Sequence, residues 1–300
     1  MGLKLVLLFA AAFILGEGAG MVKEAVSNQV FVGGKAAVSG KLADAAGNWG
    51  LSFREDGKPP VADVSAEELA KYDAWYIKNT EEKVLYLTFD AGYENGNTPA
   101  ILDALKKHSA PACFFIVGHY LKSSPDLVRR MLDEGHQITN HGYRHLLFGK
   151  KAWVYGKRTT LDGADAVLAD LSRLDSLMKE QYGYTMTMAR PPHYVDNIRG
   201  GYTSYDIYDA LGYAYMAASF DGAGWLPGAT LEDEVNAMVE PMRRALEADP
   251  DAFCGQIIFQ KDGCNMLHRT PVAFALQRQL ELLKSYGYRV VSVEELTEHS

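Results

Sequence analysis

Cysteine is scarce in this chain of 300 residues, which has three, at Cys113, Cys254 and Cys264. Their small number and irregular spacing exclude a disulfide scaffold and a cysteine-rich zinc module. A local basic stripe is also missing, and 30 Lys and Arg against 38 Asp and Glu give a formal net charge of −8. We therefore expect no nucleic acid among the partners of this chain.

Apolar side chains make up 48% of the sequence and charged ones 23%, which excludes a disordered or collagen-like chain. The length allows one large domain or two ordinary ones with an ample core. No Gly-x-Ser-x-Gly elbow follows any predicted strand, so a serine hydrolase of that type is also excluded.

The first twenty residues have the polarity of a secretory signal. Lys4 precedes an apolar run from Leu5 to Leu15, and small residues follow from Gly16 to Gly20. The run is too short to span a bilayer comfortably, which favours a signal peptide over a membrane helix; a frayed hydrophobic N-terminus and an uncleaved anchor are the alternatives. We expect an extracytoplasmic protein that is secreted, associated with the cell wall or anchored by its signal. An uncleaved signal segment is the only membrane contact expected.

Three parts follow along the chain: a signal peptide over residues 1–20, an N-terminal arm over 21–83 and one α/β domain over 84–300. The arm is irregular, with one predicted helix from Ala66 to Ile77. In the domain, short β-rich runs alternate with amphipathic helices. The predicted strands are Val84–Phe89, Ala112–Val117, Gln137–Thr139, Met186–Ala189, Tyr213–Ala217, Gln256–Phe259 and Arg289–Val293. The predicted helices are Thr98–His108, Pro125–Asp133, Leu161–Gln181, Ser204–Leu211, Leu231–Ala248 and Val272–Ser285.

This alternation predicts parallel strands joined by right-handed crossovers, in a barrel or an open doubly wound sheet. In both architectures the chemistry belongs at the carboxyl ends of the strands. Asp90 ends the first of these strands. A carboxylate there is costly to leave unpaired, so it is either hydrogen-bonded structure or a base or metal ligand.

Two more strand ends carry polar side chains. His141 and His145 follow the third strand at a spacing that converges their imidazoles and favours a metal site. Arg190 ends the fourth strand and is followed by two prolines and His193. The prolines stiffen the chain, so Arg190 either forms a surface ion pair or points inward and orients Asp90.

Together these fragments resemble the polysaccharide deacetylase family (carbohydrate esterase family 4), most closely its muramic acid deacetylase branch. The resemblance extends from about Trp49 to Leu296 and implies a distorted (β/α) barrel, of the (β/α)7 type, with fewer strands than eight. The residues that carry it are Leu87-Thr88-Phe89-Asp90-Ala91-Gly92-Tyr93-Glu94-Asn95-Gly96, Pro111 to Tyr120, Asp133-Glu134-Gly135-His136, Asn140-His141, His145 and Arg190-Pro191-Pro192.

The resemblance implies a mechanism in which a divalent metal polarises an acetamide carbonyl and activates water, while an aspartate accepts the proton. It assigns His141 and His145, with Asp90, as metal ligands, Asp90 as the base and Arg190 as the group that orients it. Zinc is the expected metal, with cobalt or manganese as alternatives. The residues expected to contact the sugar are Tyr93, Asn95, Pro192, His193 and Trp225.

Three positions depart from the family pattern. Ala91 stands where a second aspartate is usual and cannot ligate a metal, which predicts weak metal binding. Lys261 stands where the acid histidine is expected, and its unperturbed pKa of about 10.4 suits that role poorly. Asp262 and His268 are nearby substitutes for the acid. Gly224 replaces the aspartate before Trp225, and Asp221 is the candidate to take over its supporting role.

Two hypotheses remain open at this stage. One is a metal-dependent hydrolase that removes N-acetyl groups from peptidoglycan amino sugars, either N-acetylmuramic acid or N-acetylglucosamine, and releases acetate. The other is a glycan-binding pseudoenzyme on the same fold, which Ala91, Lys261 and Gly224 favour.

Overall fold

The computed structural model describes residues 51–52, 61–62, 71–149, 159–224, 228–262 and 270–297. The predicted signal peptide and most of the predicted arm lie outside these residues. Among the described residues, no helix is both long and apolar enough to cross a membrane.

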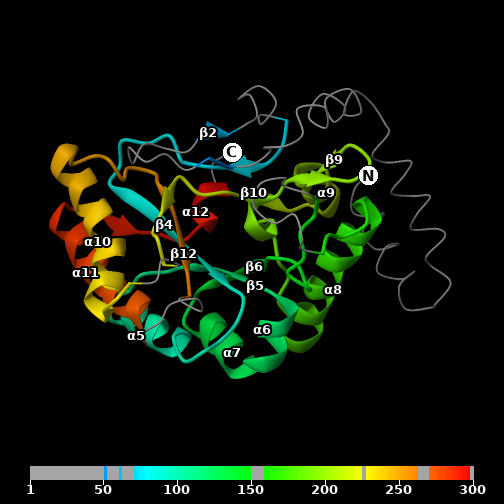
Figure 1. The fold of residues 1–300 in the computed structure, drawn as a ribbon, viewed down its shortest axis with the longest axis horizontal. Helices are drawn as coiled ribbons and strands as arrows, with labels where there is room; N and C mark the ends of the chain where they lie inside the picture. The colour runs from blue at the N-terminus through cyan, green and yellow to red at the C-terminus, as the bar shows by residue number, and fades with distance from the viewer. Residues whose placement is uncertain are drawn as a thin grey trace.

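A curled sheet of parallel strands forms the centre of the molecule, and helices surround it (Figure 1). The strand order is β11-β12-β4-β5-β6-β7-β10-β3, and β13 also pairs with β4. The sheet strands are β3 (Ala74–Trp75), β4 (Val84–Ala91), β5 (Cys113–Ile116), β6 (Gln137–Asn140), β7 (Met188–Ala189), β10 (Ala214–Met216), β11 (Phe220–Asp221), β12 (Ile257–Lys261) and β13 (Arg289–Val290). Two antiparallel pairs lie outside it, β1 (Leu51–Ser52) with β2 (Val61–Ala62) and β8 (Asn197–Ile198) with β9 (Tyr202–Thr203).

Helices connect most of the strands on the outside of the sheet, and a last short helix follows β13 (Figure 1). They are α5 (Thr98–His108), α6 (Gly118–Ser123), α7 (Pro125–Asp133), α8 (Ala164–Tyr182), α9 (Ser204–Leu211), α10 (Leu231–Ala248), α11 (Pro271–Ser285) and α12 (Glu294–Thr297), with a short 3-10 turn, η1, at Pro192–Tyr194. Capping boxes start two of them, Thr203 with Asp206 for α9 and Thr230 with Asp233 for α10. In each box the backbone and the side chains satisfy one another's hydrogen bonds, which fixes where the helix begins.

The sheet curls until its two edges are joined by one short segment of chain. Strand β10, next to one edge, is separated by three residues from β11, which forms the other edge beside β12. In between, the backbone N–H of Ser219 donates to the carbonyl of Ile257 at 2.8 Å. The predicted distorted barrel is therefore confirmed.

The helix predicted over Ala66–Ile77 is wrong for its described part, because Ala74 and Trp75 form strand β3. The carbonyls of Asp73 and Trp75 accept hydrogen bonds from Tyr215 and Ala217, so this segment extends the sheet beside β10. The segment then reaches the other edge of the sheet, where the backbone N–H of Lys78 donates to the carbonyl of Gly255 just before β12. Gly255 has a φ of +69°, and a Cβ there would lie 1.9 Å from the carbonyl oxygen of Lys78. The end of the predicted arm is thus part of the barrel.

The buried side chain of His136 makes the stability of this fold depend on pH. Its Nδ1 accepts a hydrogen bond from the backbone N–H of Ala112 at 3.2 Å, which protonation of that nitrogen would break. Burial lowers the pKa of His136 to about 4. This folded-state pKa lies below the unfolded value of about 6.5. The stabilising effect of the neutral His136 side chain is therefore complete above pH 6.5 and is lost as the pH falls toward 4.

We expect this one group to lower the free energy of unfolding by about 3 kcal/mol between pH 7 and pH 4. Urea denaturation at both pH values, with the wild type and with His136→Gln, isolates the effect. The variant is expected to lose less stability than the wild type over this interval. An equal loss in both proteins would contradict this interpretation of His136.

Candidate active site

Arg190 and Asp90 form a buried ion pair at the carboxyl end of the sheet. The Nη1 of Arg190 donates to Oδ1 of Asp90 at 2.9 Å, and the arginine side chain is 0% exposed. Its other nitrogens donate to the carbonyl of Met216, the hydroxyl of Thr88 and the carbonyl of Ala217, at 2.8–2.9 Å. A buried charge is stable only with such a full set of partners. Of the two roles considered for Arg190, the structure therefore places it inward on Asp90.

Aromatic rings enclose the same guanidinium. Its central carbon lies 4.0 Å from the ring centre of Phe115, 5.4 Å from that of Tyr194 and 5.7 Å from that of Phe259. These rings exclude water and add cation–π attraction, so Arg190 is fixed in one position. The carboxyl group of Asp90 is consequently held in one orientation.

His141 faces the second oxygen of the same carboxylate. Its Nε2 lies 3.5 Å from Oδ2 of Asp90, and its Nδ1 lies 2.9 Å from the carbonyl oxygen of Arg190. A carbonyl can only accept, so Nδ1 carries the proton and Nε2 keeps its lone pair toward the site. Burial lowers the pKa of His141 against the opposing charge of Asp90, which favours the neutral ring that binds metals.

His145 completes the predicted histidine pair. The two ring centres are 5.1 Å apart and their planes are tilted by 42°, so the spacing does bring the imidazoles together. His145 has a φ of 54°, in the left-handed region that non-glycine residues rarely adopt. The loop between the histidines must therefore be held in place by other groups.

Asp170 on α8 holds this loop, and sequence reasoning missed it. Its Oδ2 accepts hydrogen bonds from the backbone N–H of Tyr143 at 2.7 Å and of Arg144 at 3.3 Å, and Oδ1 accepts from Nε of Arg144 at 2.6 Å. The carboxylate is buried, so these bonds are made in a low dielectric where they are strong. A sequence signal did exist, because Asp170 interrupts the apolar face that Val167 and Leu171 define on the helix.

The prolines after Arg190 place His193 next to the same pair. Its ring centre lies 5.1 Å from that of His145, and Pro192 is buried beside Gly142 of the histidine loop. The structure thus brings His193 to the predicted site, in contact with a histidine that was expected to bind metal.

Lys261 lies beside Asp90, because the two residues are aligned in the register of β12 and β4. Aligned residues of neighbouring strands project to the same face of a sheet, so the lysine points into the site. Its positive charge also contributes to lowering the pKa of His141. Asp262 is the next residue and is buried, whereas His268 lies outside the described residues.

The structure gives a reason for Gly224. A Cβ at this position would lie 2.9 Å from Oε1 of Gln260 and 3.0 Å from the carbonyl oxygen of Lys261, so an aspartate there would require the Gln260 side chain and the β12 backbone to shift slightly. Asp221 ends β11, and its Oδ1 accepts from the backbone N–H of Ala223 at 2.8 Å. Asp221 therefore supports the turn that leads to Gly224, while Trp225 lies outside the described residues.

Tyr93 and Asn95 lie in the loop that follows β4. Tyr93 is 49% exposed, and its ring centre is 5.1 Å from that of His119 at the start of α6. An exposed ring of this kind is available to stack on a sugar. Asn95 is also exposed, but its Oδ1 accepts from Nδ2 of Asn97, which gives it a role in shaping the loop.

The imidazole and carboxylate donors at this site are of the types that bind a divalent metal, although they are not arranged as a complete set of ligands. Across the described ranges, no set of three His, Cys, Asp or Glu side chains is arranged to hold a metal ion. The pair His141 and His145 nevertheless offers two imidazoles, and the carbonyl that orients His141 is the outer-shell partner typical of a metal-binding histidine. Imidazole and carboxylate donors of this kind suit zinc and its first-row neighbours.

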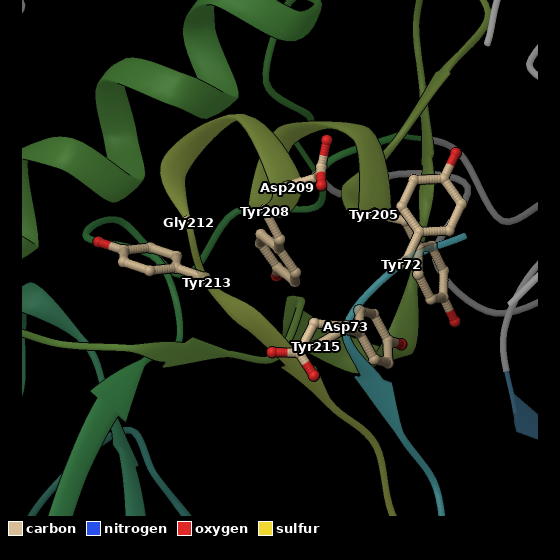
Figure 2. A pocket seen from close by; sticks show the side chains of 8 residues that line it. All are labelled: Tyr72, Asp73, Tyr205, Tyr208, Asp209, Gly212, Tyr213 and Tyr215. Atoms are coloured by element: carbon tan, nitrogen blue, oxygen red, sulfur yellow. The ribbon is translucent and has the colours of Figure 1, made fainter. Parts of the chain in front are cut away.

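A separate pocket has a volume of about 140 Å³. Figure 2 shows the side chains that line it. Side chains from α9, from the start of β10 and from the segment before β3 surround it. Since Asp73 and Tyr213 precede their strands, the pocket is at the amino end of the sheet, opposite the candidate site. None of the residues predicted to bind substrate or metal lines it.

Comparison with known proteins supports the resemblance found in the sequence. The polysaccharide deacetylase family model matches residues 77–213. A peptidoglycan-N-acetylmuramic acid deacetylase from Bacillus subtilis is 37% identical over 203 residues, which are 65% of this chain and 70% of that protein. A peptidoglycan-N-acetylglucosamine deacetylase from Bacillus cereus is 31% identical over 225 residues, which are 75% of this chain and 92% of that protein.

The fold agrees as well. The solved structure of PdaA from Bacillus subtilis, a family 4 carbohydrate esterase, superimposes with a TM-score of 0.62 at 30% identity and covers 83% of this chain and 96% of that one. The family match, the sequence identities and the structural superposition agree. This chain therefore belongs to the polysaccharide deacetylase family.

Proposed function

We propose that this protein is a metal-dependent N-deacetylase of peptidoglycan amino sugars that works outside the cytoplasmic membrane. The observation that carries the proposal is the buried network in which Arg190 holds one oxygen of Asp90 while the other oxygen faces His141. The relatives named above, which act on N-acetylmuramic acid and N-acetylglucosamine in peptidoglycan, support the substrate class. The extracytoplasmic location has its support in the apolar run from Leu5 to Leu15.

His141 and His145 would hold the metal, for which we propose zinc, with cobalt or manganese as substitutes. A divalent metal bound there supplies Lewis acidity, which polarises the acetamide carbonyl and lowers the pKa of water. The protein contributes the orientation of the rings. The carbonyl of Arg190 fixes His141, and Asp170 fixes the loop that carries His145.

Asp90 acts as the general base. Its Oδ1 is occupied by Arg190, so the remaining oxygen is the one that accepts a proton from the attacking water. The side chain of Asp90 is 11% exposed, so the carboxylate is in contact with solvent.

Lys261 is our candidate for the group that protonates the departing amine. It is aligned with Asp90 at the end of the neighbouring strand, and the ammonium group of a lysine can donate a proton. A lysine gives up this proton less readily than a histidine, so we expect slow turnover in the present chain.

The proposal predicts acetate release from purified glycan strands. The wild-type protein, stripped of metal and then supplied with zinc, cobalt or manganese, is expected to release acetate from peptidoglycan strands and to need the added ion. Enzymatic acetate determination, beside a His141→Ala control, measures this directly. Absence of release with every metal across the pH range would contradict the deacetylase proposal.

A glycan-binding pseudoenzyme is the second candidate, favoured by Lys261 at the acid position and by Ala91. Lys261→His separates the two. If the poor general acid limits the deacetylation rate, Lys261→His is expected to raise this rate by about tenfold or more. An efficient general acid contributes about 100- to 10,000-fold to a reaction rate. A pseudoenzyme is expected to bind glycan strands equally well before and after the change and to release no acetate.

A further inference from the structure

A pocket of about 540 Å³, larger than the one in Figure 2, lies at the amino end of the barrel. It is formed where helices α5 and α11, which pack against each other, come to their carboxyl ends (Figure 1). Its other walls come from the segments that lead into β5 and β13. The pocket is therefore at the opposite end of the sheet from the candidate active site.

Every charged residue that lines this pocket is basic. Lys107, Lys284 and Arg289 contribute a formal charge of +3, and His108 lines the pocket beside them. None of these side chains forms an ion pair with any part of the chain that the structure describes. Lys107 donates to Oε1 of Gln277 at 3.4 Å, which is a neutral partner. The fold thus gathers positive charge from segments that are distant in the chain.

The two helix ends account for part of this positive charge. Lys107 and Lys284 lie in the last turns of α5 and α11, where the unsatisfied carbonyl groups of each helix carry about −0.5 elementary charge. Both ends together supply about −1 against the formal +3, so about +2 remains at the pocket. No acidic residue is among the described residues that line it. The remaining charge favours a ligand with two negative charges.

The inner wall of the same pocket is apolar. Ala110, Leu280 and Leu283 line it and are buried, with 2–5% of each residue exposed. A ligand that fits both walls has an anionic group for the basic side chains and a carbon part for the apolar wall. A phosphate monoester has this composition, with a charge of about −1.5 to −2 and oxygens that Arg and Lys bind.

We propose that this pocket binds organic phosphate esters. The phosphate lies among Lys107, Lys284 and Arg289, and the carbon part of the ester lies toward Leu280 and Leu283. A single carboxylate, with a charge of −1, would leave about half of the remaining positive charge uncompensated. The ester is either a free small molecule or part of a polyol phosphate polymer, because both present the same chemical group.

Isothermal titration calorimetry of the full-length chain with glycerol 3-phosphate tests this inference. The double variant Lys284→Gln/Arg289→Gln removes two of the three cations, and both residues are exposed, so the fold is expected to persist, as circular dichroism would verify. Lys179→Gln/Arg244→Gln is the matched control. It removes two exposed cations on α8 and α10 and changes the net charge by the same amount.

We expect the dissociation constant for glycerol 3-phosphate to be at least about tenfold higher in Lys284→Gln/Arg289→Gln, since one hydrogen bond to a charged group is typically worth about that factor. The control is expected to match the wild type. Poly(glycerol phosphate) is the second probe. Tighter binding per phosphate group than for glycerol 3-phosphate identifies a polymer as the source, and equal binding identifies a free ester; both results support the site.

A wild-type chain that binds neither probe would overturn the phosphate site. An equal loss of affinity in the two double variants would overturn it as well, because it would show that binding depends only on net charge. Acetate release is expected to be the same in Lys284→Gln/Arg289→Gln and the wild type, since the pocket is remote from Asp90 and His141. The failure of this inference would therefore leave the deacetylase proposal unaffected.

Discussion

Arg190→Met is expected to lower the free energy of unfolding by about 3–5 kcal/mol. The change removes a fully buried cation and leaves the carboxylate of Asp90 without its partner, while Thr88 and two backbone carbonyls lose their donors. Methionine is unbranched and fills much of the same space, so the loss reports mainly on the charge and its hydrogen bonds. Chemical denaturation at pH 7, monitored by circular dichroism, measures it.

A double-mutant cycle separates the ion pair from the rest of the network. Arg190→Met is made both in the wild type and in the Asp90→Asn variant. If the unpaired carboxylate is the main cost, the loss in the free energy of unfolding is expected to be smaller in the Asp90→Asn variant by at least about 1 kcal/mol. The same destabilisation in both backgrounds would show that Arg190 acts only through its other contacts, to Thr88, to two backbone carbonyls and to the aromatic rings. That outcome would contradict its assignment as the residue that orients Asp90.

Asp90→Asn is expected to lower kcat for deacetylation by about 100- to 10,000-fold, the range typical for loss of a general base. The amide of asparagine has nearly the shape of the carboxylate, so the barrel is expected to fold. The amide cannot accept the proton from water, however, so the variant lacks a base. Acetate release under saturating substrate measures the effect.

Asp133→Asn serves as the control for this prediction, because Asp133 is an exposed aspartate at the end of α7, away from the strand ends. It is expected to keep wild-type kcat. A kcat for Asp90→Asn within about tenfold of the wild type would contradict the role of Asp90 as base.

The parts of the fold that local chemistry determines could be predicted from the sequence. Helix α7 begins at a proline, and capping boxes start α9 and α10, and all three have the bounds expected. Strand β4 was expected because a continuous apolar run is typical of a buried parallel strand. Strand β3 was not, since its two residues owe their conformation to pairing with β10, which is about 140 residues away in the chain.

The residues of the candidate site could also be predicted only in part. The sequence located Asp90, His141 and Arg190 because each follows a predicted strand, and the carboxyl ends of these parallel strands meet at one edge of the sheet. Nδ1 of His141 has a backbone carbonyl as its partner, and a pattern of side chains in the sequence cannot predict such a contact. The reason for Gly224 was equally hidden, because it lies in the approach of Gln260 from another strand.

The most direct test of the central proposal is metal-dependent acetate release from peptidoglycan glycan strands by the wild type and by Asp90→Asn, each stripped and then reloaded with zinc. We predict release by the wild type that stops on chelation and returns with zinc, and a rate lower by about 100-fold or more in Asp90→Asn. Release that is independent of added metal, or equal in the two proteins, would contradict a site built on Asp90 and the histidine pair.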